Sequence, residues 1–301
     1  MKQPLEILLA GVIDYAGLFP PASLDMRAAT EAYASYLTDP AAAMLGRFIV
    51  PVLRLREFED AATSLPPRDA GDKAWRLSVL PGPDLEADVD LALKFNSRNT
   101  GDAGAAHAEI DCMEIRVSTA DEILAAGSIM PEHISAFFEI PLDRDPSAMI
   151  AAVKRVGGYA KARTGGIVRD AFPDAPSVAR FMIRCREADV AFKLTAGLHH
   201  PLRAEYRLTY ATDAPRGVMF GYLNMFVAAV LAWNGSDEDT ITQALLATDQ
   251  HDFGVSDRAL AFRGHLLPTA VIADARSNFI TSFGSCSFRE PVDELATLFM
   301  S

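Results

Sequence analysis

Between Cys112 and Thr195 the chain alternates four short apolar runs with longer amphipathic stretches. The runs read CMEIRV (112–117), SAFFEI (135–140), GYAKAR (158–163) and VAFKLT (190–195). The stretches between them, at about 119–128, 145–155 and 175–187, carry apolar residues every three or four positions, which is the period of an amphipathic helix. Because parallel strands need a crossover connection, usually a helix, this alternation predicts a parallel sheet.

The same alternation continues toward the N-terminus. Runs at 47–51 and 75–80 precede helical stretches at about 55–64 and 84–96, which brings the series to six strand–helix units. No GxGxxG motif follows an early strand, so an open doubly wound sheet is the less favoured alternative. We therefore expect an α/β fold, a TIM-type (β/α)8 barrel, formed as a single domain by residues 1–301.

The ends of the chain follow this pattern less regularly. Residues 217–222 and 283–288 are candidates for the seventh and eighth strands, so the barrel is expected to be irregular in its C-terminal third. Residues 1–40 are expected to form a helical or loop extension, whose aromatic, double-proline segment Asp14–Pro21 must pack on the protein, for example at the barrel mouth. The small-residue segment Gly101–Ala106 is expected to be a plain linker.

Composition excludes several classes of partner. The chain has 28 Lys and Arg against 40 Asp and Glu, a net charge of −12, which disfavours nucleic acid and anionic membranes as partners. The longest uncharged run is shorter than a membrane span. Three cysteines without a CxxC pair suit a reducing compartment, so we expect a cytoplasmic protein. The expected partner is a small anionic metabolite, and the apolar segment Met219–Trp233 would serve equally as core or as the interface of a homo-oligomer.

Charged residues stand at the ends of four successive predicted strands, where apolar residues are expected. The C-terminal ends of barrel strands face the active site, and residues two apart on a strand point to the same face. Buried lysines are costly unless they are paired, so the two strand lysines indicate either a functional pair or structural salt bridges with a neighbouring glutamate. The strand-end residues are Glu114, Arg116, Glu139, Lys161, Arg163 and Lys193.

Two loops after these strands favour binding of an anion. Glycines let backbone N–H groups approach a phosphate or carboxylate closely, and arginine adds bidentate contacts. One loop reads RTGG (163–166) and the other runs from Thr195 to Arg203. The expected substrate-binding residues are Arg163, Gly165, Gly166, Arg203, Arg116 and Glu114.

The run KLTAGL (193–198) resembles the K-x-[ST]-x-G-[FL] sequence around the Schiff-base lysine of deoxyribose-phosphate aldolase. That enzyme is a TIM-barrel class I aldolase whose lysine lies on the sixth strand, where our count also places Lys193. The resemblance implies a lyase or aldolase in which Lys193 forms an imine with a small anionic carbonyl compound. Lys161 would lower the pKa of Lys193 by like-charge repulsion, and Glu139 or His199 would transfer protons. No cofactor is expected for this chemistry.

Two other functions stay open. The first is a metal-dependent barrel enzyme whose divalent ion is held by histidine and carboxylate ligands. Its ligands would be His199 and His200 with a carboxylate from Glu114, Glu139 or Asp14. The second is a binding protein for an anionic metabolite, in which the lysines act only as counter-charges. Nucleophilic hydrolysis is not expected, because there is no GxSxG elbow and Cys286 has no histidine near it in the sequence.

Overall fold

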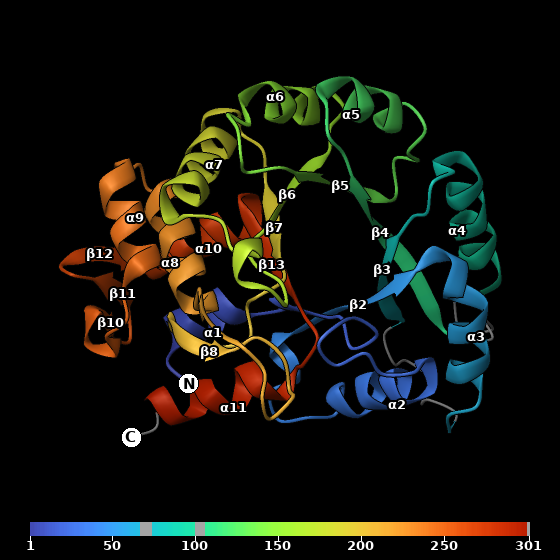
Figure 1. Cartoon of the computed structure of the whole chain (residues 1–301), viewed down its shortest axis with the longest axis horizontal. Coiled ribbons are helices and arrows are strands. Elements are labelled where there is room, and N and C mark those ends of the chain that lie inside the picture. Colours follow the sequence, from blue (N-terminus) through green and yellow to red (C-terminus); the bar gives the residue numbers. More distant parts are fainter. Residues whose placement is uncertain (67–73, 100–105, 300–301) are drawn as a thin grey trace.

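The computed structural model is a closed barrel of eight parallel strands surrounded by helices (Figure 1). It describes residues 1–66, 74–99 and 106–299, so the expected Gly101–Ala106 linker, apart from Ala106, lies outside the described residues. Around the barrel the strands follow the order β1-β13-β7-β6-β5-β4-β3-β2. This confirms the predicted TIM-type (β/α)8 barrel. The barrel strands are β1 (Ile13–Tyr15), β2 (Leu45–Pro51), β3 (Trp75–Leu80), β4 (Ala108–Arg116), β5 (Ser135–Ile140), β6 (Tyr159–Arg163), β7 (Phe192–Thr195) and β13 (Ile280–Ser285).

The five helices predicted between the strands are α3 to α7, and each ends within three residues of its expected bounds. Their starts follow from local chemistry: at α7 the side chain of Asp174 accepts a hydrogen bond from the Ser177 N–H and caps the helix. The helices of the whole fold are α1 (Gln3–Leu9), α2 (Met26–Tyr36), α3 (Leu55–Thr63), α4 (Leu85–Asn99), α5 (Ala120–Gly127), α6 (Ser147–Arg155), α7 (Ala175–Glu187), α8 (Tyr222–Trp233), α9 (Glu238–Leu246), α10 (Thr269–Asn278) and α11 (Arg289–Phe299).

The six strands predicted from the sequence are β2 to β7, so one barrel strand precedes them. That strand is β1, which pairs with β13 on one side and β2 on the other. Residues 1–40, expected as an extension, therefore supply the first barrel strand. Pattern analysis misses β1 because it has only three residues, all buried, with Asp14 in the middle, whereas a recognisable strand pattern needs four or more.

Only one of the two candidates for the remaining strands belongs to the barrel. Residues 283–288 overlap β13, the eighth barrel strand, whereas residues 217–222 divide between β9 (Arg216–Met219) and the start of α8. Strand β9 pairs antiparallel with β8 (Ala204–Arg207) outside the barrel. It cannot be a barrel strand because its residues alternate between exposed and buried, while a parallel barrel strand is covered on both faces.

The C-terminal third is irregular, as expected. Three short antiparallel strands lie between α9 and α10 and form a second small sheet at the left edge of Figure 1. They are β10 (Phe253–Val255), β11 (Ala259–Phe262) and β12 (His265–Pro268). The N-terminal end of the chain and helix α11 lie close to each other in the same view, and Leu5 and Leu295 line one pocket.

Helix α8 forms the most apolar part of the core. Every residue from Tyr222 to Ala232 is buried, so the Met219–Trp233 segment is core and does not offer an oligomer interface. Its one buried amide, Asn224, accepts a hydrogen bond from the Arg203 N–H at 2.9 Å and donates to the carbonyls of Ala244 and Ala247 at 2.7 and 2.8 Å. Within residues 1–66, 74–99 and 106–299, no helix has the length and apolar character needed to cross a bilayer.

Replacing Asn224 by leucine is expected to lower the free energy of unfolding by at least about 2 kcal/mol. The change leaves one buried N–H group and two carbonyl groups without their partner, and each such group costs about 1–3 kcal/mol. Urea unfolding followed by circular dichroism measures the loss. Asn278→Ala is the control, because Asn278 makes one exposed hydrogen bond to Asp274 and its loss is expected to cost under about 0.5 kcal/mol. Equal losses in both variants would contradict the role given to Asn224.

Candidate active site at the C-terminal ends of the barrel strands

A continuous chain of ion pairs crosses the interior of the barrel. Its side chains alternate in sign and come from five of the eight barrel strands. We call this set the charge ladder. Its members, in order of contact, are Asp14, Lys193, Glu114, Lys161, Glu139 and Arg163. The three negative and three positive charges balance, and all members except Asp14 are among the catalytic or substrate-binding residues expected from the sequence, whereas Asp14 is expected there only as a possible metal ligand.

Glu114 joins the two lysines of the charge ladder. Lys161 and Lys193 are partners in the register between β6 and β7, so their side chains start side by side. Glu114 Oε1 lies 2.6 Å from Lys193 Nζ, and Glu114 Oε2 lies 2.8 Å from Lys161 Nζ. Asp14 Oδ2 contacts Lys193 Nζ from the other side at 2.5 Å. Both lysines are buried, and without these carboxylates their burial would cost several kcal/mol.

The ladder reaches solvent at its other end. Glu139 Oε2 lies 2.6 Å from Lys161 Nζ, and Glu139 Oε1 accepts a hydrogen bond from Arg163 Nε at 3.0 Å. Arg116 lies 3.9 Å from the same carboxylate. The side chains of Arg163 and Arg116 are 44% and 79% exposed, so both can contact a dissolved anion.

The ladder reverses one expectation from the sequence. Burial alone would lower the pKa of Lys193, but the charges of Asp14 and Glu114 outweigh it and raise that pKa above its ordinary value. The expected lowering of the pKa of Lys193 is therefore not found. The physical reason is that Asp14 and Glu114 both contact its ammonium group, and their attraction outweighs burial and the repulsion from Lys161.

Two serine hydroxyl groups also donate hydrogen bonds to the buried carboxylates. Ser78 donates to Glu114 Oε1 and Ser282 donates to Asp14 Oδ2, both at 2.6 Å. Burial alone would raise the pKa of Glu114, but Lys161 and Lys193 outweigh it and hold that pKa far below its ordinary value. Asp14 was considered only as a metal ligand, because its strand β1 was not recognised as part of the barrel.

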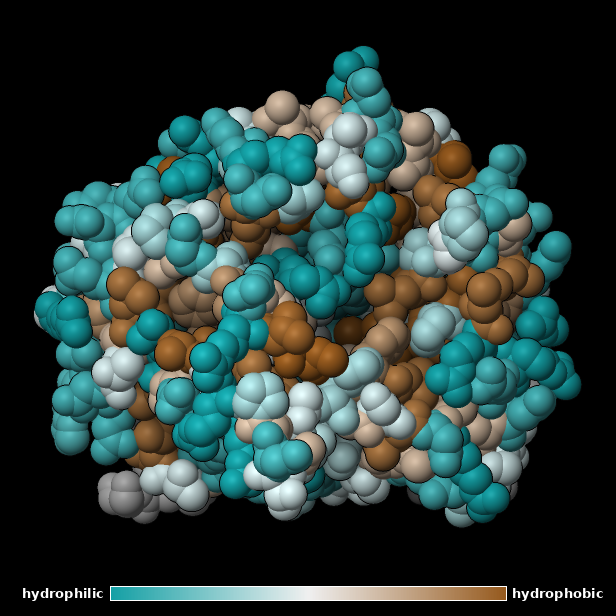
Figure 2. Space-filling view, in the orientation of Figure 1, coloured by the Kyte–Doolittle hydropathy of each residue, from teal (hydrophilic) through white to brown (hydrophobic). Residues whose placement is uncertain are grey.

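A cavity of about 350 Å³ lies over the C-terminal ends of the barrel strands. Figure 2 shows the face in the view of Figure 1, hollowed near its middle between hydrophilic and hydrophobic residues. Phe19, Pro20 and Pro21 line the cavity, so the double-proline segment does pack at the barrel mouth. Its polar lining includes Arg116, Glu114, Lys161, Arg163, His199 and Cys286.

Four of the expected catalytic and substrate-binding residues do not line this cavity. One is Glu139, which lines a neighbouring pocket together with Arg116 and Arg163. Lys193 is fully buried beneath it, with no exposed surface. Arg203 stands just before β8 outside the barrel, and its backbone N–H binds the amide of Asn224. Gly165 packs against another loop, because a Cβ atom there would lie 2.8 Å from the Cα atom of Gly197. Its neighbour Gly166 does line the cavity.

Cys286 and His199 meet at the cavity wall, although 87 residues separate them in the sequence. His199 Nδ1 lies 3.8 Å from Cys286 Sγ and 3.2 Å from Glu290 Oε2. Burial alone would lower the pKa of His199, but the hydrogen bonds to Cys286 and Glu290 raise it to about 10. Among the described residues Nε2 of this ring has no hydrogen-bond partner, so it is available to a bound molecule. The sequence offered no signal for this contact, which depends on the closure of the barrel.

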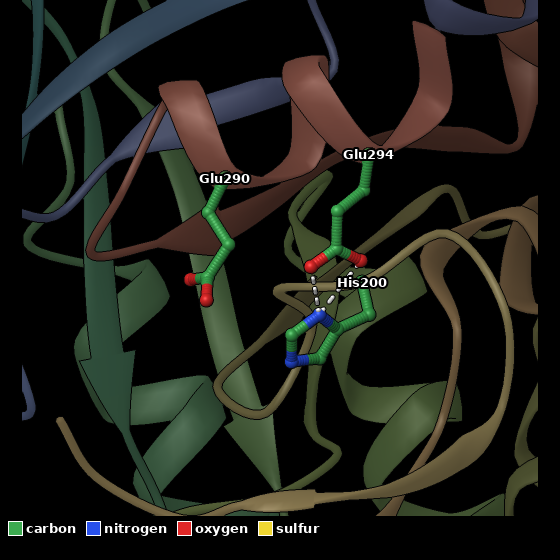
Figure 3. A group of neighbouring side chains, drawn as sticks. All are labelled: His200, Glu290 and Glu294. Atoms are coloured by element: carbon green, nitrogen blue, oxygen red, sulfur yellow. Dashed lines mark hydrogen bonds and ion pairs between the residues drawn. The ribbon is translucent and has the colours of Figure 1, made fainter. Parts of the chain in front are cut away.

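His200 turns away from the charge ladder and toward α11. Figure 3 shows Glu290 and Glu294 extending from this helix toward the imidazole ring. The ligand atoms of these three side chains lie within 4.8 Å of one another. The carboxylates expected from the sequence as metal ligands, those of Asp14, Glu114 and Glu139, are instead paired with the lysines of the charge ladder.

Comparison of the chain with protein-family models, curated proteins and solved structures found no match. The fold and the site alone therefore define the class of protein. It is a TIM-type barrel with two lysines that are ion-paired to a shared glutamate near the C-terminal ends of its strands, and with a polar cavity above them.

Proposed function

We propose that the protein is a lyase of the aldolase type that acts on a small anionic carbonyl compound through an imine on Lys161. The observation that carries this proposal is the position of Lys161, which is the ladder lysine that lines the cavity. Lys193, favoured from the sequence, is fully buried beneath it. A nucleophile must touch its substrate, so the imine role passes from Lys193 to Lys161.

The strand count supports the same choice, although the KLTAGL run that carries the resemblance to deoxyribose-phosphate aldolase surrounds Lys193. In that family the imine lysine lies on the sixth barrel strand. Once β1 is counted, the sixth strand is β6, which carries Lys161, and Lys193 falls on the seventh. Lys193 would then be the second lysine of the pair and would hold Glu114 in place through its 2.6 Å contact.

Lys161 must lose a proton before it can attack a carbonyl carbon. Glu139 is the base for this step, because its carboxylate contacts Lys161 and it lines, together with Arg163 and Arg116, the pocket next to the cavity. Burial raises the pKa of Glu139, but Lys161 and Arg163 outweigh it and keep that pKa low. An anionic substrate that draws Arg163 toward itself removes one of these charges and makes Glu139 the stronger base.

The reaction then follows from the groups around the cavity. Glu139 takes one proton from the ammonium group of Lys161, and the free amine adds to the carbonyl carbon. The carbonyl oxygen takes one proton from the amine nitrogen and one from Glu139 and leaves as water, which gives a protonated C=N bond and restores the Glu139 carboxylate. A hydroxyl on the second carbon from the carbonyl then gives its proton to Glu139, the bond between that carbon and its neighbour breaks, an aldehyde leaves, and the electron pair moves into an enamine. His199, whose Nε2 faces no protein partner among the described residues, is placed to protonate the enamine carbon, and water releases the product from Lys161.

Borohydride trapping tests the proposal directly. The full chain is incubated separately with pyruvate, 2-oxobutyrate and dihydroxyacetone phosphate, reduced, and mapped by peptide mass spectrometry. We expect a ligand-sized mass gain on Lys161 with at least one compound. The surface lysine Lys154, paired with Asp189, is the internal control and should stay unmodified.

Two results would contradict the imine on Lys161. An adduct on Lys193 with none on Lys161 would mean that the nucleophile is Lys193 on β7. Binding of a probe measured by calorimetry, with no adduct on any lysine of the folded protein, would favour the binding-protein function in which the ladder lysines are counter-charges.

A further inference from the structure

We propose that His200, Glu290 and Glu294 bind a divalent transition-metal ion, with Zn²⁺ as the best fit, at the rim of the barrel. This rim site lies outside the charge ladder and does not depend on the imine chemistry. It joins the loop that follows β7 to the C-terminal helix α11 (Figure 3). One imidazole nitrogen and two carboxylates form a donor set that suits Zn²⁺.

The spacing of the donor atoms fits a shared ion. Two ligands bound to one zinc ion at about 2.0–2.2 Å stand roughly 3.3 Å apart in a tetrahedral site. His200 Nδ1 lies 2.8 and 2.9 Å from the two oxygens of Glu294, and the ligand atoms of all three residues lie within 4.8 Å. These values bracket the required spacing, so small side-chain rotations bring the three donors around one ion.

The ligands are held in place by their surroundings. The ring of His200 stacks on Tyr206, with a centroid distance of 3.4 Å and an interplanar angle of 10°. The carbonyl of His200 accepts a hydrogen bond from the Tyr222 N–H at 2.9 Å, which fixes its backbone to α8. Glu290 and Glu294 are four residues apart on α11 and share one face of the helix. Little reordering therefore opposes binding.

The contacts of Glu290 connect the rim site to the cavity. Glu290 Oε2 accepts a hydrogen bond from Tyr210 at 3.2 Å and lies 3.2 Å from His199 Nδ1, and His199 lines the cavity. The side chains of Glu290 and Glu294 are 28% and 41% exposed, so an ion can reach them from solvent. Three protein ligands leave a fourth position for water, which is the arrangement of an open zinc site.

Calorimetry with ZnCl₂ on the chelator-treated full chain tests the rim site. We expect one bound ion per chain in the wild type and at least about 30-fold weaker binding in His200→Ala and in Glu294→Gln. Because the ion links α11 to the β7 loop only in the folded state, saturating Zn²⁺ should also raise the Tm of the wild type by several degrees and leave both variants unchanged. Circular dichroism checks that the variants are folded, and Co²⁺ substitution gives a visible absorption band typical of tetrahedral ligands.

His251 provides a matched control. It forms an exposed pair with Asp249, with Nδ1 and Oδ1 2.7 Å apart, but no third ligand joins that pair in the metal-ligand groups found among the described residues. His251→Ala should therefore bind Zn²⁺ like the wild type. Absence of binding in the wild type, or binding that survives both His200→Ala and Glu294→Gln, would overturn the proposal. Lys161→Arg should keep Zn²⁺ binding, which separates the rim site from the imine chemistry.

Discussion

Replacing Glu114 by glutamine is expected to lower the free energy of unfolding by about 3–5 kcal/mol, which is the cost of removing one partner from a buried ion pair. Glu114 is buried and contacts the ammonium groups of both Lys161 and Lys193. Glutamine keeps the shape of the side chain but removes one of the three negative charges of the ladder, whereas all three positive charges remain. The two lysines then repel each other with no charge between them. Denaturant unfolding at pH 7 measures the loss.

An exposed ion pair provides the control. Glu57 lies 2.7 Å from Arg54 on the surface, and Glu57→Gln is expected to change the free energy of unfolding far less than Glu114→Gln does, because solvent screens an exposed ion pair. Similar losses in Glu57→Gln and Glu114→Gln would mean that burial of the ladder contributes nothing. So would a Glu114→Gln protein as stable as the wild type.

The stability difference between the wild type and Glu114→Gln also depends on pH in a definite direction. The pKa of Glu114 is far lower in the folded protein than in the unfolded chain, where it is about 4.3. The unfolded chain therefore takes up the proton first, and the contribution of Glu114 is complete above that pKa and lost as the pH falls below it. We expect a constant difference between pH 6 and 8 that shrinks below about pH 4. A constant difference down to pH 3 would contradict this assignment.

The barrel could be predicted from the sequence because most of its strands have a recognisable sequence pattern. Strands such as β5 are short β-branched or aromatic runs, and helices of regular period separate them. The two strands that were missed or only partly located, β1 and β13, lack that signal. Strand β1 has three residues and a central Asp14, and β13 (ITSFGS) contains Thr281, Ser282 and a final Gly-Ser, where small or polar residues interrupt the apolar pattern.

The charge ladder could be predicted almost completely because its members break the apolar pattern of their own strands. Glu114, Lys161 and Lys193 are conspicuous for that reason. Which lysine faces the cavity was not predictable, because it depends on the tilt of the strands and on the depth of each side chain in the barrel. The contact of His199 with Cys286 was not predictable either, since the segment after β13 and the loop after β7 meet only when the barrel closes.

The electrostatics of the ladder and the proposed chemistry constrain each other. A lysine between two carboxylates is stable as an ammonium ion and unreactive as a nucleophile. Glu114 is shared by two lysines, whereas Glu139 is shared by Lys161 and the partly exposed Arg163. Arg163 is the more exposed partner of Glu139, so its contact is the one that an anion in the cavity changes most readily. In the proposed mechanism the ladder therefore keeps Lys161 protonated at rest and releases its proton when an anion binds.

Replacing Lys161 by arginine is expected to lower the rate at which the trapped carbonyl compound adds to an aldehyde, the reverse of the cleavage, on the order of 10⁶-fold, the scale for removal of a covalent nucleophile. Arginine keeps a positive charge between Glu114 and Glu139, but its guanidinium group does not lose a proton in proteins and cannot form an imine. Affinity for the same compound should change by less than about tenfold, because Arg163 and Arg116 still face the anion. Single-turnover assays measure the first quantity and calorimetry the second.

The arginine variant separates the imine function from the counter-charge function because the two make opposite predictions for it. If Lys161 acts only as a counter-charge, Lys161→Arg keeps full activity or full ligand response, and the imine is excluded. Lys154→Arg, on the surface beside Asp189, controls for the general effect of exchanging lysine for arginine and should match the wild type. Denaturant unfolding of Lys161→Arg completes the test. A stable protein that binds the compound but does not turn it over is the result that the position of Lys161 in the cavity requires.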